Sequence, residues 1–152
     1  MPWFAMGIEI TAEDLDPDRI TALLGVPPTV QHQRGEPVSG KDGTPRPPRK
    51  FGRWAVRMEA IESDEWDANE AAKLLIAKFA ADPSIWRAIS ERARLRLTLA
   101  LFLENFNQGF SLEPAVLSWL SNRNVTLDID IYEGDRDPEQ DSSSEADREV
   151  PH

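Results

Sequence analysis

The chain contains no cysteine, and only two histidines and one tyrosine occur among its 152 residues. Without cysteine, disulfides, thiolate metal sites and cysteine nucleophiles are excluded, and the composition fits a reducing compartment. The sequence also lacks a complete P-loop, a G-x-G-x-x-G turn, an H-E-x-x-H zinc motif and a G-x-S-x-G nucleophile elbow. Nucleotide, zinc and serine-hydrolase chemistry are therefore disfavoured, and we expect no cofactor.

Long hydrophobic runs are missing as well. The N-terminus has neither the basic flank nor the apolar stretch of a signal peptide, and no segment approaches the length of a transmembrane helix. We therefore expect a soluble cytoplasmic protein without a membrane partner. With 40% apolar residues, the chain is long enough for one well-packed domain, which we place at residues 1–132.

The net charge of -10 is unevenly distributed along the chain. Residues 133–152 hold eight acidic residues against two arginines and almost no apolar side chain, so this segment cannot bury enough surface to offset its ordering entropy. It is predicted to be a disordered acidic tail. Residues 37–50, rich in proline and glycine and without periodicity, are predicted to form a long mobile basic loop.

Alternating apolar residues predict strands over Trp3–Ile10, Phe51–Glu59, Leu95–Leu103 and Val125–Tyr132, and helices over Leu15–Leu24, Leu112–Ser121 and the middle of the chain. The strand and helix near the start recur in altered form near the end. In both copies a polar residue (Asp14 or Ser111) is followed three positions later by a proline that suits a first helical turn. Duplication and coincidence are equally good explanations of this similarity.

The strands are apolar on one side only, which is typical of a sheet covered by helices on one face. Leu95, Leu97, Leu99 and Leu101 are predicted to lie under the helices, together with Val125, Leu127, Ile129 and Ile131. Leu23 is predicted to lie on the apolar, core-facing side of the first helix. The predicted fold is therefore α+β, with a four- to five-stranded, mainly antiparallel or mixed sheet. Two strand-helix-strand halves, with a helical pair between them, would make it a variant of the ferredoxin-like arrangement.

Several motifs resemble a known family: L-D-P-D-R-I-T-A-L-L-G-V-P-P-T from Leu15, R-G-E from Arg34, the strand around Trp54, and the closing S-L-E-P and L-D-I-D-I-Y. Together they resemble the bacterial domain of unknown function 4279 over roughly residues 4–132. The resemblance implies a small standalone bacterial protein. It supplies no activity and no catalytic residues.

The polar face of the predicted sheet is the first candidate site. Its side chains come from Glu9, Arg94, Arg96, Thr98, Thr126, Asp128, Asp130 and Tyr132. Asp128 and Asp130 point the same way because they are two apart on a strand, so with Glu9 they could hold Mg²⁺ or act as an acid/base pair. The favoured interpretation is cross-strand ion pairing with Arg94 and Arg96, without a metal.

The basic stretch is the second candidate site. Its cations are Lys41, Arg46, Arg49, Lys50, Arg53 and Arg57, and Trp54 lies among them. The stretch contains a weak polyproline-type motif and could bind a polyanion, but the net charge of -10 disfavours nucleic acid. An acidic protein partner is preferred over nucleic acid, and a solvated loop without a specific role is the favoured interpretation of these residues.

These observations favour a non-catalytic cytoplasmic binding protein. One concrete version is an immunity-type inhibitor of a bacterial toxin, by analogy with other small acidic bacterial proteins. The alternative is a small enzyme or ligand-sensing domain that uses the polar sheet face. A pocket converging on His32, Glu9 and Asp128 would favour the enzyme, since His32 is the one histidine outside the tail.

Overall fold

The computed structural model describes residues 3–59, 61–62, 67–103 and 109–133. The acidic tail predicted from the sequence therefore lies outside the described residues, apart from Glu133. In chain order the elements are β1 (Trp3–Ala12), α1 (Pro17–Leu24), β2 (Val30–His32), β3 (Val38–Ser39), β4 (Pro45–Arg46), β5 (Gly52–Arg57), β6 (Ile61–Glu62), α2 (Ala68–Ile76), α3 (Pro83–Ser90), β7 (Arg94–Leu103), α4 (Pro114–Asn122) and β8 (Thr126–Glu133).

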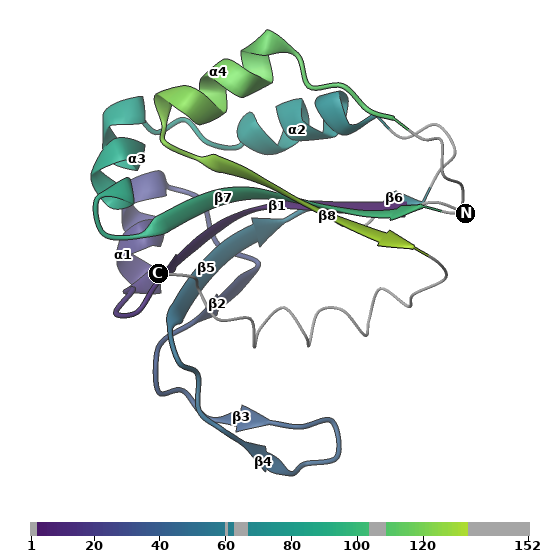
Figure 1. Ribbon diagram of the computed structural model, residues 1–152. Helices are drawn as coiled ribbons and strands as arrows, with labels where there is room; N and C mark the ends of the chain where they lie inside the picture. Colours follow the sequence, from purple (N-terminus) through teal and green to yellow (C-terminus); the bar gives the residue numbers. More distant parts are fainter. Residues whose placement is uncertain (1–2, 60, 63–66, 104–108, 134–152) are drawn as a thin grey trace.

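The main sheet has the strand order β2-β5-β1-β7-β8, and the short strand β6 also pairs with β1. All neighbours are antiparallel except β7 and β8, which are parallel. The four helices lie on one face of this mixed sheet (Figure 1). The α+β fold class predicted from the sequence is thus confirmed. The short strand β6 was not predicted.

The first part of the chain has the ferredoxin-like order of elements. The strands β1, β2, β5 and β7 are connected as strand-helix-strand-strand-helix-strand, with α2 and α3 together in the place of the second helix. The order β2-β5-β1-β7 in the sheet is the one that this connection produces, because β5 inserts between β1 and β2. The helix α4 and the strand β8 then extend the sheet beyond β7.

The two strand-helix units that look alike in the sequence are built differently. Both helices begin at a proline, Pro17 and Pro114, because a first-turn amide has no intrahelical acceptor to lose. The preceding residues, Asp16 and Glu113, occupy the N-cap position, in place of the predicted Asp14 and Ser111. In addition, β8 pairs directly with β7, whereas β2 is separated from β1 by β5. The similarity therefore extends to the strand and the helix start, and not to the return strand.

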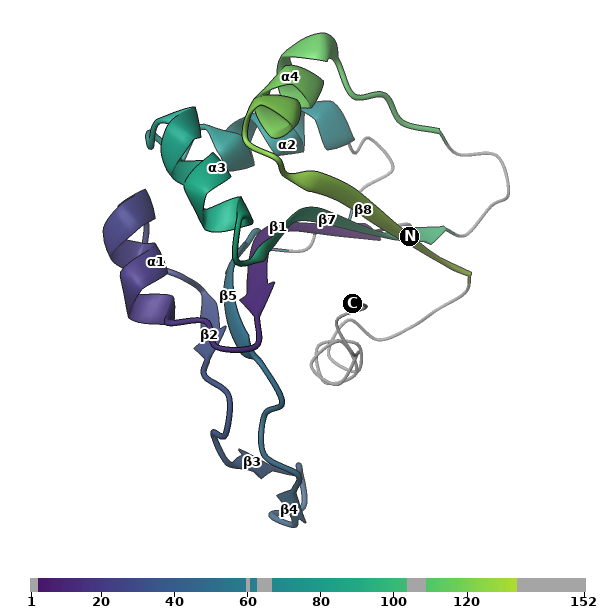
Figure 2. The same ribbon diagram turned by 60° about the vertical axis from the view of Figure 1, so that its left-hand side comes forward.

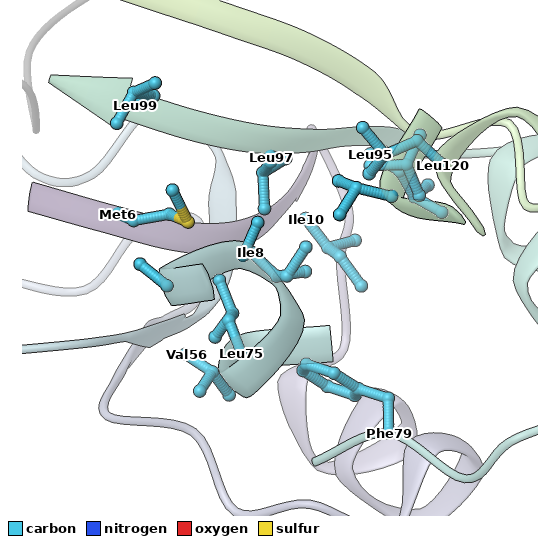
Figure 3. Close-up of a cluster of buried hydrophobic side chains, with 14 of the residues drawn as sticks. Met6, Ile8, Ile10, Val56, Leu75, Phe79, Leu95, Leu97, Leu99 and Leu120 are labelled. Carbon is cyan, nitrogen blue, oxygen red and sulfur yellow. The ribbon is translucent and has the colours of Figure 1, made fainter. Parts of the chain in front are cut away.

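The core lies between the helices and the sheet. Figure 3 shows side chains of β1, β5 and β7 meeting those of the helices, among them Ile8, Leu97, Val56, Leu75 and Phe79. Ile8, Leu75 and Leu97 are completely buried. The alternation predicted for these strands is confirmed, because Leu95, Leu97, Leu99 and Leu101 are all buried on this face.

Three side chains predicted to be in the core are instead exposed. Leu23 of α1 is 39% exposed, because Ile20 and Leu24 occupy the buried side of this short helix. Ile129 and Ile131 of β8 are 38% and 66% exposed. Both views show β8 continuing beyond α4, the helix that contacts it (Figures 1 and 2).

The sheet is strongly curved. Figure 2 shows β5 and the C-terminal end of β1 turning away from the direction of β7 and β8, so that the face opposite the helices is concave. Polar side chains on that face are buried even though no helix of the described residues covers it: Glu9 is 8% exposed, Thr11 2% and Arg53 4%. The curvature thus brings together side chains from neighbouring strands. Among the described residues, no helix is both long and apolar enough to cross a membrane.

Candidate functional site

The basic segment contains regular structure, contrary to the sequence-based expectation of an irregular loop. β3 pairs with β4 in a hairpin that extends away from the main sheet (Figure 1). Its turn is closed by hydrogen bonds from the Gly40 amide to the Thr44 carbonyl at 2.8 Å and from the Gly43 amide to the Gly40 carbonyl at 2.9 Å. Gly43 has φ +79°, a conformation that side chains with a Cβ rarely adopt. The turn thus depends on glycine at this position.

Further bonds fix the base of the hairpin. The Gly35 amide donates to the Arg49 carbonyl at 2.8 Å, and the Arg49 amide donates to the Glu36 carbonyl at 2.9 Å. Nearby, Arg34 bonds Glu13 at 2.6 Å and Asp14 at 2.9 Å, which ties the start of the hairpin to the turn before α1. The hairpin therefore leaves the sheet in a direction set by main-chain hydrogen bonds.

Four of the predicted binding cations lie on this hairpin. Lys41, Arg46 and Lys50 are exposed, and Arg49 is half-buried. Within the part of the chain that the structure describes, Lys41, Arg46 and Arg49 form no salt bridge. The sequence thus located a cationic surface, which we call the cationic hairpin and define as residues 38–50.

The remaining residues of the predicted binding surface lie on β5 and are placed differently. Trp54 is completely buried on the helix side, where its indole Nε1 donates to the Thr21 hydroxyl at 3.0 Å. Arg53 is buried on the concave face, and Arg57 is half-buried. Trp54 and Arg53 therefore cannot contact a partner at the surface. Both were assigned to the binding surface because they follow the basic loop in sequence, but β5 begins at Gly52 and carries them into the sheet.

The concave face carries a row of ion pairs across four strands. Arg53 of β5 bonds Glu9 of β1 at 2.9 Å, and Glu9 bonds Arg96 of β7 at 2.5 Å. Arg96 also bonds Asp128 of β8 at 2.8 Å. We call these four residues the ion-pair ladder. The cross-strand pairing predicted for Arg96 is present, with the addition of Arg53, which the sequence analysis had assigned to the basic binding surface.

The ladder keeps Glu9 ionised. Burial alone would raise the pKa of Glu9, but the charges of Arg53 and Arg96, and hydrogen bonds from both, outweigh burial and hold the pKa below its ordinary value. Charge-assisted bonds of this kind stabilise the carboxylate strongly. A carboxylate held in this state is a poor general acid at neutral pH.

The other predicted residues of this face have separate surroundings. Arg94 is half-buried and, among the described residues, takes part in no salt bridge. Tyr132 stacks on Phe102, with ring centroids 4.6 Å apart and an interplanar angle of 10°. Asp130 is half-buried beside them on β8. The structure therefore brings Glu9, Arg96 and Asp128 together and leaves Arg94 outside the ladder.

His32 lies in register with Arg53 at the edge strand β2, with its ring 6.0 Å from that of Phe51. Burial and the nearby charges of Arg49 and Arg53 lower its pKa below the ordinary value, so it is neutral at physiological pH. Arg53 lies next to His32 in the sheet and binds Glu9. The histidine thus faces an arginine that is already engaged in the ladder.

Two hollows in the surface were not expected from the sequence. One, of about 850 Å³, lies between α1 and α3 and is lined by apolar residues such as Leu23 and Ile85 and by charged residues such as Arg19 and Glu91. The other, of about 610 Å³, lies where β1 ends and β7 begins and includes Thr11 and Arg94. Neither is lined by the three residues on which an enzymatic site would converge, His32, Glu9 and Asp128.

Within the described residues, no group of three acidic or histidine side chains is arranged to hold a metal ion. We predict that millimolar Mg²⁺ or Mn²⁺ leaves the melting temperature unchanged, because Arg96 already occupies the space between Glu9 and Asp128. Thermal melts with and without the ions test this. A saturable rise in the parent that disappears in the double variant Asp128→Ala, Asp130→Ala would contradict the prediction.

Comparison with known proteins identifies a family but no characterised relative. No curated protein and no solved structure is similar enough to this chain to count as a match. The family model of the domain of unknown function DUF4279 matches residues 3–134, which span every helix and strand described above. The resemblance noted in the sequence is thereby confirmed, and the chain belongs to the DUF4279 family.

Proposed function

We propose that this protein is a non-catalytic binding protein of the bacterial cytoplasm that binds an acidic protein through the cationic hairpin. One observation carries the proposal. The hairpin extends from the sheet and presents Lys41 and Arg46 to solvent, with no salt bridge to either among the described residues. Cations that no salt bridge of the described residues engages are available to an acidic partner.

The charge of the whole chain favours a protein partner over nucleic acid. A nucleic acid presents phosphates along its length and would approach the rest of a molecule whose net charge is -10. An acidic protein can instead present a local patch that fits the hairpin alone. Trp54, an aromatic side chain of the basic stretch on which a base could stack, is also buried and not accessible to a nucleic acid.

A more specific form of the proposal is an immunity-type inhibitor that binds and blocks a bacterial toxin. The projecting hairpin would enter an acidic cleft of such a toxin. This version rests on analogy with other small acidic bacterial proteins, and the first partner to try is the product of a gene next to the one that encodes this chain.

The alternative function, a small enzyme or ligand-sensing domain on the concave face, has weaker support. The carboxylates of Glu9 and Asp128 already accept hydrogen bonds from arginines. A substrate or metal would have to displace these bonds, at the cost of leaving charged groups partly unpaired in a buried site.

The proposal is tested by reversing the charge of the hairpin. The variant Lys41→Glu, Arg46→Glu is compared with a control, Lys78→Glu, Arg92→Glu, that makes the same charge change at exposed positions outside the hairpin. We expect the parent and the control to capture the same acidic protein from cells that naturally make the chain, and the hairpin variant to lose it. In measurements with the purified partner, the hairpin variant should then bind about tenfold more weakly than the parent, most clearly at low salt. Equal capture by all three proteins would refute the proposal.

A further inference from the structure

The strand β8 forms one edge of the main sheet. Its inner side pairs in parallel with β7 from Arg96 opposite Thr126 to Leu103 opposite Glu133. No other strand of the described residues pairs with its outer side. An edge strand of this length presents a row of main-chain donors and acceptors to which another strand can be added.

The apolar side of β8 is left uncovered. Ile129 and Ile131 are 38% and 66% exposed, whereas their register partners on β7, Leu99 and Leu101, are 1% and 2% exposed. Burial therefore ends abruptly between two neighbouring strands. A strand added outside β8 would lie beside both isoleucines. It would continue the apolar face of the sheet, which the helices cover at β7.

The charge of β8 is entirely negative. The strand carries Asp128, Asp130 and Glu133 and no basic residue. Asp128 and Asp130 share the concave face and are half-buried, and Asp128 bonds Arg96 of the ladder. A strand that pairs with β8 would therefore place its own side chains next to carboxylates on one face and next to isoleucines on the other.

A second copy of this chain does not fit that edge. Two copies related by a two-fold axis would pair β8 with itself in antiparallel orientation, where residues directly opposite share a face. Two registers pair most of the strand. In the first, Asp128 of each copy lies opposite Asp130 of the other copy. In the second, Asp130 of one copy lies opposite Asp130 of the other. Like charges directly opposite destabilise a strand pair, so the acidic residues disfavour self-association here.

We propose that the outer edge of β8 binds an extended segment of another protein in which basic residues alternate with apolar ones. The basic side chains would lie against Asp128 and Asp130 on the concave face, and the apolar ones against Ile129 and Ile131 on the helix side. Main-chain hydrogen bonds supply affinity, and the alternation supplies specificity. This surface lies on the opposite side of the sheet order from β2 and β5, which carry the hairpin between them, so the inference does not depend on the proposed function.

The test uses a blocked peptide, acetyl-Lys-Val-Lys-Val-Lys-Val-amide, and a peptide of the same composition in the order Lys-Lys-Lys-Val-Val-Val. Binding to the full chain is measured by fluorescence anisotropy. We expect the alternating peptide to bind about tenfold more tightly than the block peptide, because only alternation separates charge and apolar groups onto the two faces. Hydrogen exchange should slow in residues 126–133 on binding.

Two protein variants and one control complete the test. Asp130→Lys and, separately, Ile131→Gln should each weaken the alternating peptide about tenfold or more, while Asp18→Lys, an equal charge change on exposed α1, should change it less than about twofold. Ile131 is mostly exposed, so this variant keeps the test valid if Asp130→Lys disturbs folding. No binding of the alternating peptide up to about 1 mM, equal binding of the block peptide, or equal effects of Asp130→Lys and Asp18→Lys would each overturn the inference.

Discussion

The replacement Glu9→Ala is expected to lower the free energy of unfolding by about 3–5 kcal/mol, because it leaves a buried arginine without its partner. Glu9 is the central member of the ion-pair ladder, bonded to Arg53 at 2.9 Å and to Arg96 at 2.5 Å. Arg53 is 4% exposed and would lose its salt bridge, since Glu9 is its partner in the ladder. Urea denaturation of the parent and the variant at neutral pH measures the difference.

The same replacement should reduce the sensitivity to acid. In the folded protein the pKa of Glu9 is below its ordinary value, so its contribution to stability is present above about pH 4.3 and is lost as the pH falls through the folded pKa. The difference in stability between the parent and Glu9→Ala should therefore shrink in this acidic range. The control is Asp128→Asn at the end of the ladder, which should cost much less because the Asp128 side chain is 36% exposed. Equal costs for both variants would contradict a buried ladder centred on Glu9.

The replacement Leu99→Ala is expected to destabilise the protein by about 2–5 kcal/mol, because it leaves a cavity in the core that the surrounding side chains cannot fill completely. Leu99 is 1% exposed at the centre of β7, between β1 and β8. The matched control is Leu23→Ala, which removes the same atoms from a side chain that is 39% exposed and should cost clearly less. Denaturant titrations of both variants test the assignment. A cost for Leu99→Ala within about 0.5 kcal/mol of the parent would show that this face of β7 does not lie in the core.

The comparison of these two leucines shows how far the sequence could predict the fold. Alternation along β7 assigns Leu99 to the buried face without knowledge of any neighbour, because a strand covered on one side has a strict period of two. In the short helix α1, Leu23 and Leu24 are adjacent, and the period of 3.6 allows either to be the buried one. Contacts with β5, which the sequence does not specify, determine which of the two is inside.

The exposure of side chains at the end of β8 could not be predicted from the sequence for a similar reason. The pattern correctly places Ile129 and Ile131 on the helix side of the sheet, but their burial depends on how far α4 reaches over the strand. That reach follows from the length and direction of a helix that packs also on α2. Periodicity reports the face on which a residue lies and carries no information about whether another element covers it.

The candidate sites, too, could be predicted from the sequence only in part. The sequence identified the cations at residues 41–57 as one group, since charge is visible without a fold. The strand predicted from Phe51 agrees with the start of β5 at Gly52. Charge alone, however, did not separate exposed Lys41 and Arg46 from buried Arg53. The strands of the hairpin were also missed, because β3 and β4 are two residues each and too short for any periodicity.

We infer that the cationic hairpin, and not the concave face, contacts the partner. Site-specific photocrosslinking in cells that naturally make the chain tests it most directly, with a photoreactive residue at Thr44 in the hairpin turn or at Arg94 on the concave side of β7. We predict that an acidic protein is crosslinked from position 44 and not from position 94. Crosslinking of the same protein from position 94 alone would contradict this inference and assign binding to the concave face.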